Sequence, residues 1–111
     1  RQRQMCIRDS HQEWKQYLWI RDSGYCQWCG AQGTDPHHIL FRSLGGKDDP
    51  WNGILLCRQC HDLAQGNKIA RVQLWALLWK RGVLREEWVT EILPYVDGGL
   101  PELQQVAFMC R

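Results

Sequence analysis

Apolar positions near the N-terminus recur at helical spacing. Ser10 and Glu13 have the spacing of a capping box, a pair of reciprocal side-chain bonds that marks a helix start. Trp14 and Leu18, four residues apart, place an apolar stripe on one face of the helix. Gly24 favours a stop after that stripe. The pattern therefore predicts a helix that begins at Ser10 and ends before Gly24.

The second half of the chain repeats the helical period over a longer stretch. Apolar residues at three- and four-residue spacing predict a helix over residues 68–80, with Gly82 just after its end. A shorter helix is expected over residues 85–93, where Pro94 cannot continue it. A last helix is expected to end near Met109. The second half of the chain is therefore predicted to consist mainly of helices joined by turns.

Between these helical regions the pattern changes to short apolar runs separated by turn residues. Residues 37–41 and 54–56 are predicted to form two strands. Residues 44–50, rich in Gly, Asp and Pro, are predicted to form a loop, and we interpret the Asn-Gly pair at 52–53 as a turn. A helix is expected over residues 57–65. The whole order predicts a small α+β fold.

Four cysteines form two CxxC pairs, Cys26 with Cys29 and Cys57 with Cys60. Two such pairs suit one closed, tetrahedral Zn²⁺ site. Because four thiolates leave no open position for water, this zinc is expected to be structural. A redox protein is the weaker alternative, since it would carry a single CxxC in a thioredoxin-like pattern.

Three histidines and an asparagine accompany the cysteine pairs: His37, His38, Asn52 and His61. Such residues can bind a second metal, and a neutral histidine accepts a proton from water near neutral pH. A purely structural zinc module does not need them. Because neighbouring strand residues face opposite sides, His37 and His38 can share a site only at a strand end, which the preceding Pro36 favours.

The segment from Tyr25 to about Gln65 resembles the HNH endonuclease family. The resemblance rests on four groups: His-His-Ile at 37–39, Gly-Gly at 45–46, Asn-Gly at 52–53 and Leu-Cys-Arg-Gln-Cys-His at 56–61. It implies a small zinc-stabilised ββα-metal core, also called the His-Me finger, with flanking helices.

The resemblance also implies roles for these side chains. His38 would be the general base, while His37 and His61 would bind one catalytic divalent ion. For Asn52 we favour orientation of the loop that aims the base, with metal ligation as the alternative. We interpret Asp35 as the start of an Asp-Pro turn rather than as an oxygen ligand.

The implied substrate is DNA, hydrolysed at its phosphodiester bonds to 5′-phosphate and 3′-hydroxyl ends. We expect Mg²⁺ or Mn²⁺ as the catalytic ion because phosphate and water complete an oxygen-rich shell, with Ni²⁺ or Zn²⁺ as alternatives. Arg42 is the first candidate for phosphate binding, and Lys47 on the adjoining loop is a weaker one. The alternative function is a non-catalytic zinc module that binds nucleic acid or protein, in which only the four cysteines matter.

We expect three regions along the chain. Residues 1–10 are interpreted as an adapter-like or disordered tail, because Arg-Gln-Met-Cys-Ile-Arg-Asp resembles translated sequencing-adapter sequence. Residues 11–66 would form the nuclease core with its N-terminal helix. Residues 67–111 would form a helical C-terminal extension, in which we recognise no motif.

Composition adds little to this picture. A net charge of +2 over 111 residues is too small to indicate nucleic acid by itself, although basic residues gather between Arg58 and Arg85. Cys6 and Cys110 are interpreted as free thiols. The sequence has no leader and no apolar run that could span a bilayer, so we expect a cytoplasmic protein in a bacterial or phage-infected cell. A phage or mobile-element protein is a candidate partner.

Overall fold

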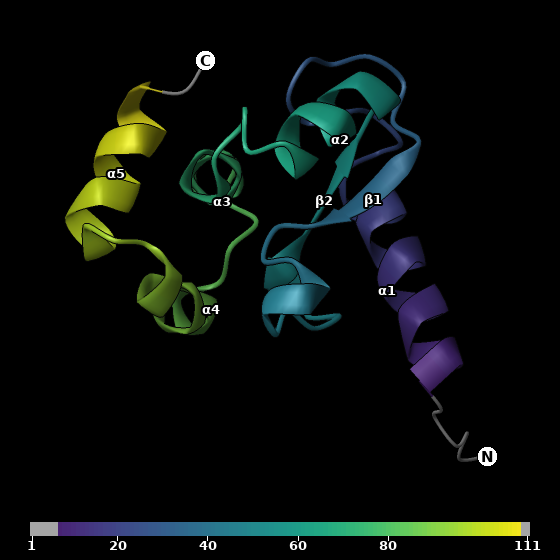
Figure 1. Cartoon of the computed structure of the whole chain (residues 1–111), viewed down its shortest axis with the longest axis horizontal. Helices are drawn as coiled ribbons and strands as arrows, with labels where there is room; N and C mark the ends of the chain where they lie inside the picture. Colours follow the sequence, from purple (N-terminus) through teal and green to yellow (C-terminus); the bar gives the residue numbers. More distant parts are fainter. Residues whose placement is uncertain (1–6, 110–111) are drawn as a thin grey trace.

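The computed structural model describes residues 7–109 and confirms the α+β class (Figure 1). Its helices and strands are α1 (Ile7–Arg21), β1 (Asp35–His38), β2 (Gly53–Leu56), α2 (Arg58–Gln65), α3 (Arg71–Lys80), α4 (Glu86–Ile92) and α5 (Gly99–Met109). Short 3-10 turns cover residues 42–44, 50–52 and 93–95. Of the predicted tail over residues 1–10, residues 1–6 lie outside the described residues, whereas residues 7–10 belong to α1. The predicted free thiols of Cys6 and Cys110 also lie outside the described residues.

Two helix starts differ from the sequence prediction. The first helix begins at Ile7, so Ser10 lies inside it and the predicted capping box is wrong. The helix can begin before Ser10 because residues 7–9 include no Pro or Gly, the residues that most disfavour a helix. The start of α3 moves from residue 68 to Arg71, because Asn67 has a left-handed backbone and the Gln73 side chain accepts the Ala70 N–H at 2.8 Å.

The two strands form one antiparallel ladder, in which His37 lies opposite Ile54 and His38 lies opposite Gly53. The turn predicted at residues 52–53 is wrong, because Gly53 opens β2 with extended backbone, φ −140°. A Cβ on Gly53 would lie 2.6 Å from the Trp14 ring and closer still to Leu18. Glycine is needed here because α1 packs directly on the strand, not because the chain turns.

A buried carboxylate joins the N-terminal helix, the sheet and α3. Asp22 is fully buried and accepts two hydrogen bonds from Arg21, at 2.8 and 3.0 Å. Its oxygens also accept the Leu55 N–H at 2.9 Å and an Arg81 N–H at 3.0 Å. Since a buried charge is tolerated only when it is paired and hydrogen-bonded, these contacts together fix the three elements.

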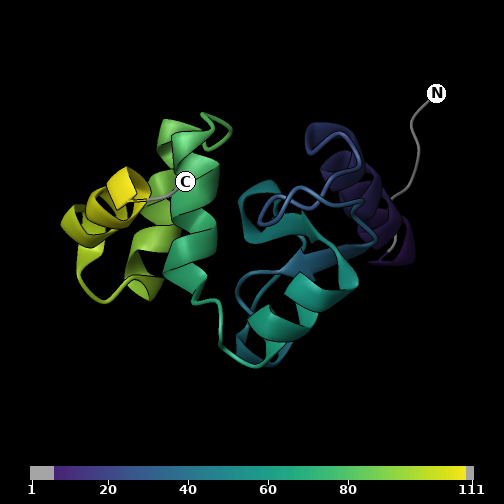
Figure 2. The same cartoon turned by 90° about the horizontal axis from the view of Figure 1, so that it is seen from above.

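The three C-terminal helices gather on one side of the molecule, and α1, the sheet and α2 lie on the other (Figure 2). The core is nevertheless continuous, since Ile54 and Leu56 of β2 belong to the same buried cluster as Trp75 of α3 and Leu103 of α5. Trp75 also donates its indole N–H to the Trp51 carbonyl at 3.0 Å. The helical extension is therefore packed on the ββα core. Among the described residues, no helix combines the length and hydropathy that a membrane span requires.

Candidate functional site

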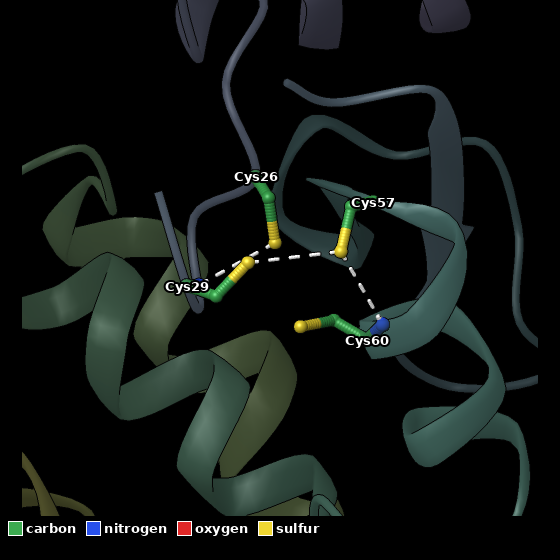
Figure 3. A group of neighbouring side chains, drawn as sticks. All are labelled: Cys26, Cys29, Cys57 and Cys60. Carbon is green, nitrogen blue, oxygen red and sulfur yellow. Dashed lines mark hydrogen bonds between the residues drawn. The ribbon is translucent and has the colours of Figure 1, made fainter. Parts of the chain in front are cut away.

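Four cysteine sulfurs converge between the first knuckle and the start of α2 (Figure 3). All four Sγ atoms lie within 4.8 Å of one another, and those of Cys29 and Cys57 are 3.7 Å apart. A tetrahedral zinc with Zn–S bonds of about 2.3 Å requires sulfurs about 3.8 Å apart. The cluster predicted from the two CxxC pairs is therefore present with spacing that fits zinc.

The backbone around both cysteine pairs supports a thiolate cluster. The Cys29 N–H points at the Cys26 sulfur and the Cys60 N–H at the Cys57 sulfur, each at 3.5 Å. Burial raises the pKa of the Cys26 thiol, but hydrogen bonds from backbone N–H groups, those of Cys29 and Cys57 first, lower it to about 7. Burial, followed by the neighbouring sulfurs, raises the pKa of Cys60. The fit to zinc therefore rests on the spacing of the four sulfurs, whose thiolate form the ion binds.

A second site is a cavity of about 310 Å³ at the end of β1. Its lining is formed by Pro36, His37, His38, Phe41, Arg42, Ser43, His61 and Gln65. The structure thus brings together the three histidines that the sequence singled out, along with Arg42. Lys47, the other predicted DNA-binding residue, is exposed and is not part of the cavity wall.

His37 lies on the inner side of this cavity and is buried. Its ring meets the His61 ring edge-on, with centroids 5.1 Å apart, and packs similarly on Phe41. Burial, followed by the positive charges that His61 and His38 can carry, lowers the pKa of His37 to about 4. His37 is therefore a neutral imidazole near pH 7, which is the form that binds metal ions.

His61 projects from the first turns of α2 toward β1. Its Nδ1 lies 3.1 Å from a carboxylate oxygen of Asp35, yet the geometry is not that of a hydrogen bond, and this buried nitrogen has no hydrogen-bond partner. Asp35 also accepts a hydrogen bond from Arg58 at 3.0 Å. The interpretation of Asp35 as a turn residue is wrong, because it is the first residue of β1 and faces α2. Pairing across the ladder with Leu56 places it there.

His38 has different neighbours, as strand alternation requires. Its Nε2 lies 2.7 Å from Asp48 Oδ1, and its ring stacks on Trp14 with centroids 4.1 Å apart. Burial lowers the pKa of His38, and the Asp48 carboxylate opposes that shift. Because β1 ends at His38, both neighbouring histidines still reach one cavity.

Asn52 is fully buried directly before β2. Its side-chain oxygen accepts the Leu40 N–H at 2.7 Å, and its amide donates to the carbonyls of Leu40 and Lys47 at 3.1 and 2.9 Å. Gly46 allows this approach, since a Cβ there would collide with the Leu40 carbonyl. With its oxygen and amide both engaged by backbone, Asn52 ties this loop to Leu40 and Lys47.

Sequence reasoning missed three residues beside His38: His11, Trp14 as a ring neighbour, and Asp48. His11 Nδ1 lies 3.1 Å from the second Asp48 oxygen, and the ligand atoms of His11, His38 and Asp48 lie within 4.8 Å of one another. Among the described residues, this cluster and the four cysteines are the groups of three or more whose ligand atoms lie this close. The only signal was the i, i+3 spacing of His11 and Trp14 on one helix face.

Residues 26–65 match the family model described as HNH endonuclease. The match includes both cysteine pairs, the three cavity histidines and Asn52, and it covers less than half of the 111-residue chain. No curated protein and no solved structure matches the chain. The resemblance inferred from the sequence motifs is therefore confirmed for this segment.

Proposed function

We propose that the protein is a metal-dependent endonuclease that hydrolyses DNA phosphodiester bonds, on the basis of the match of residues 26–65 to the HNH endonuclease family. The observation that carries the proposal is the cavity lined by His37, His38 and His61 together with Arg42. A cavity with three imidazoles and a guanidinium offers metal ligands, a base and a phosphate-binding group within one small volume.

The residues present fit a catalytic divalent ion. His37 is neutral, and His61 has a buried nitrogen without a hydrogen-bond partner, so these two side chains would hold the ion. The Asp35 carboxylate lies 3.1 Å from this same nitrogen, so it would place a negative charge beside the ion. When bound, Mg²⁺ or Mn²⁺ neutralises charge on the phosphate and on the leaving oxygen.

His38 would act as the general base. It takes a proton from water, the water oxygen forms a bond to phosphorus, and the bond from phosphorus to the 3′ oxygen breaks. The 3′ oxygen leaves with the electron pair and takes a proton from solvent, which gives 5′-phosphate and 3′-hydroxyl ends. Arg42 would bind the phosphate bidentately, and Asn52 would hold the loop that follows the base.

A plasmid-nicking assay with added Mg²⁺ or Mn²⁺ tests the proposal. We expect cleavage by the natural chain and a loss of about 100-fold or more in His38→Ala, since a general base contributes about 10² to 10⁴ in rate. Gln105→Ala, an exposed polar position on α5, is the matched control and should cleave normally. Zinc content, measured for every variant, reports that the cysteine cluster has stayed intact.

Each outcome has a distinct meaning. Equal cleavage by the natural chain and His38→Ala would overturn the assignment of the base. Absence of cleavage by all variants, with zinc bound and the helical content unchanged, would overturn the nuclease proposal. In that case DNA retention by the zinc-loaded protein would favour the alternative of a non-catalytic binding module.

A further inference from the structure

We propose that Asp48 is a positioning residue for His38, and that His11 and Trp14 of α1 complete the support that holds this ring. The arrangement places the ring proton of His38 on Nε2 and leaves Nδ1 as the basic nitrogen. This inference rests on the proposed function, since it describes how the proposed base is aimed. It also makes α1, which lies outside the family-matched segment, part of the catalytic unit.

The first step is the hydrogen bond between His38 and Asp48. Burial raises the pKa of Asp48, but hydrogen bonds from His38 and His11 outweigh it and keep the pKa below its usual range. The carboxylate is thus ionised near neutral pH and can only accept hydrogen bonds. At an Nε2–Oδ1 distance of 2.7 Å, His38 Nε2 must be the donor. A neutral imidazole has one N–H, so the lone pair is on Nδ1.

The second step concerns Asp48 itself, whose other oxygen is also engaged. His11 Nδ1 lies 3.1 Å from Oδ2, so one histidine binds each carboxylate oxygen. A carboxylate held at both oxygens cannot rotate freely about its terminal bond. His11 therefore supports His38 in two ways, through Asp48 and by stacking on the His38 ring with centroids 6.0 Å apart.

The third step is the stacking of Trp14 on His38. The two ring planes are inclined by 12°, with centroids 4.1 Å apart, and Trp14 donates its indole N–H to the Asp49 carbonyl at 2.9 Å. Trp14 is buried, so its ring is held by packing. Asp48 resists rotation of the His38 ring within its plane, and Trp14 resists tilting out of that plane.

The fourth step places the remaining nitrogen. His38 lines the cavity with His37 and His61, whereas Asp48 and Trp14 line a separate depression together with Pro50. Within residues 11–109, the His38 ring is hydrogen-bonded through Nε2 to Asp48, and Nδ1 is the nitrogen that remains for the cavity. Proton transfer from water to Nδ1 would create an imidazolium beside the ionised Asp48, which stabilises the new charge.

Asp48→Ala tests the inference in the full chain, and Asp97→Ala, at an exposed position after the 3-10 turn 93–95, is its matched control. Loss of the carboxylate that supports the proposed base should lower kcat about 10- to 100-fold, as is usual when a residue that orients a functional side chain is removed. KM should change by no more than about twofold. His11→Ala should lower kcat less, because Asp48 keeps its bond to His38. Full kcat in Asp48→Ala would overturn the proposal.

A second readout does not depend on activity. The ring-nitrogen NMR spectrum of the zinc-loaded natural chain should show a slowly exchanging proton on His38 Nε2, lost in Asp48→Ala and kept in Asp97→Ala. A proton on Nδ1 would overturn the inference even if the protein is a nuclease. If the natural chain fails to cleave, the nuclease proposal fails, while the ring proton still decides how His38 is held.

Metal binding gives the competing outcome, because His11, His38 and Asp48 could themselves hold an ion. Titration of the protein with Zn²⁺ alone, followed by ultracentrifugation and metal analysis, measures the stoichiometry. One tightly bound zinc in both the natural chain and Asp48→Ala is expected. A second tightly bound zinc that Asp48→Ala loses would identify a metal site and overturn the positioning role.

Discussion

The ββα core and the C-terminal helices are stabilised by different kinds of contact. Among residues 11–109, the buried polar side chains are Asp22, His37 and Asn52, and all of them lie in the first half of the chain. The core around them has two strands of four residues and a cysteine cluster that fits zinc. From Arg71 onward the buried side chains are apolar throughout, as in Trp75.

This difference teaches how a small domain can carry reactive groups. In a small segment, histidine and asparagine at buried positions reduce the apolar area that is buried on folding. Burial of apolar area is the largest favourable contribution to folding. A zinc ion on the four cysteines would, together with the polar contacts, replace part of that contribution within the core. The helices supply the rest from outside, through the cluster that joins Trp75 to the strands.

Removal of zinc should give the largest effect and should separate the two regions. Structural zinc contributes about 10–16 kcal/mol to folding in zinc-finger peptides, which matches the whole stability of a small domain. With a strong chelator, amide hydrogen exchange should lose protection in β1 and β2 and keep part of it in α3 and α5. Re-addition of zinc is the control, and protection of the strands without zinc would contradict the comparison.

Trp75→Ala should be the most damaging change in the helical region. Trp75 is fully buried, and truncation of such a side chain costs about 3–5 kcal/mol. Thermal unfolding should show this loss, while the protein still binds one zinc. Trp19→Ala, at a position on α1 that is 43 % exposed, is the matched control and should cost much less. Equal losses in both variants would refute the assigned role of Trp75.

Asn52→Ala should have a smaller effect on stability, confined to the loop before β2. Its loss leaves the polar backbone groups of Leu40 and Lys47 without partners, at about 1–3 kcal/mol. Hydrogen exchange should increase at the Leu40 amide, with zinc content unchanged. Gln105→Ala serves again as the exposed control, and an unchanged Leu40 amide would contradict this role.

Arg81→Ala should have the smallest effect and tests the junction between the two regions. The Arg81 side chain is 32 % exposed, and Asp22 keeps both bonds from Arg21, so the loss should be about 1 kcal/mol. Denaturant unfolding of this variant and of Arg85→Ala, an exposed arginine, measures the difference. If Arg85→Ala costs as much, the bond from Arg81 to Asp22 does not couple the regions.

Ligand chemistry made the cysteine cluster predictable from the sequence. Two thiolates that bind one zinc from the same knuckle or helix start lie a few positions apart, so the spacing within each CxxC pair already indicated the cluster. Asn52, which lies between His38 and His61 in the sequence, was identified as a candidate site residue from the family motif. Helical periodicity located α3 to within a few residues, and Pro94 indicated where α4 ends.

Contacts between distant residues were not predictable. His11 and Asp48 are 37 positions apart and belong to no periodic pattern, so their bond leaves no trace in the sequence. Gly53 was misinterpreted because a turn and a closely packed helix both require glycine. Asp35 was misinterpreted for a similar reason, since Asp-Pro commonly opens turns yet here opens a strand.

The register of the short sheet has a consequence for the two neighbouring histidines. A ladder of four pairs is marginal alone, and it is extended by the Thr34 N–H bond to Leu56 at 3.0 Å and the Ile39 N–H bond to Asn52 at 3.1 Å. A slip of one position would turn every side chain of β1 to the opposite face. The register of the backbone pairing therefore determines which of two chemically identical imidazoles contacts His61 and which contacts Asp48.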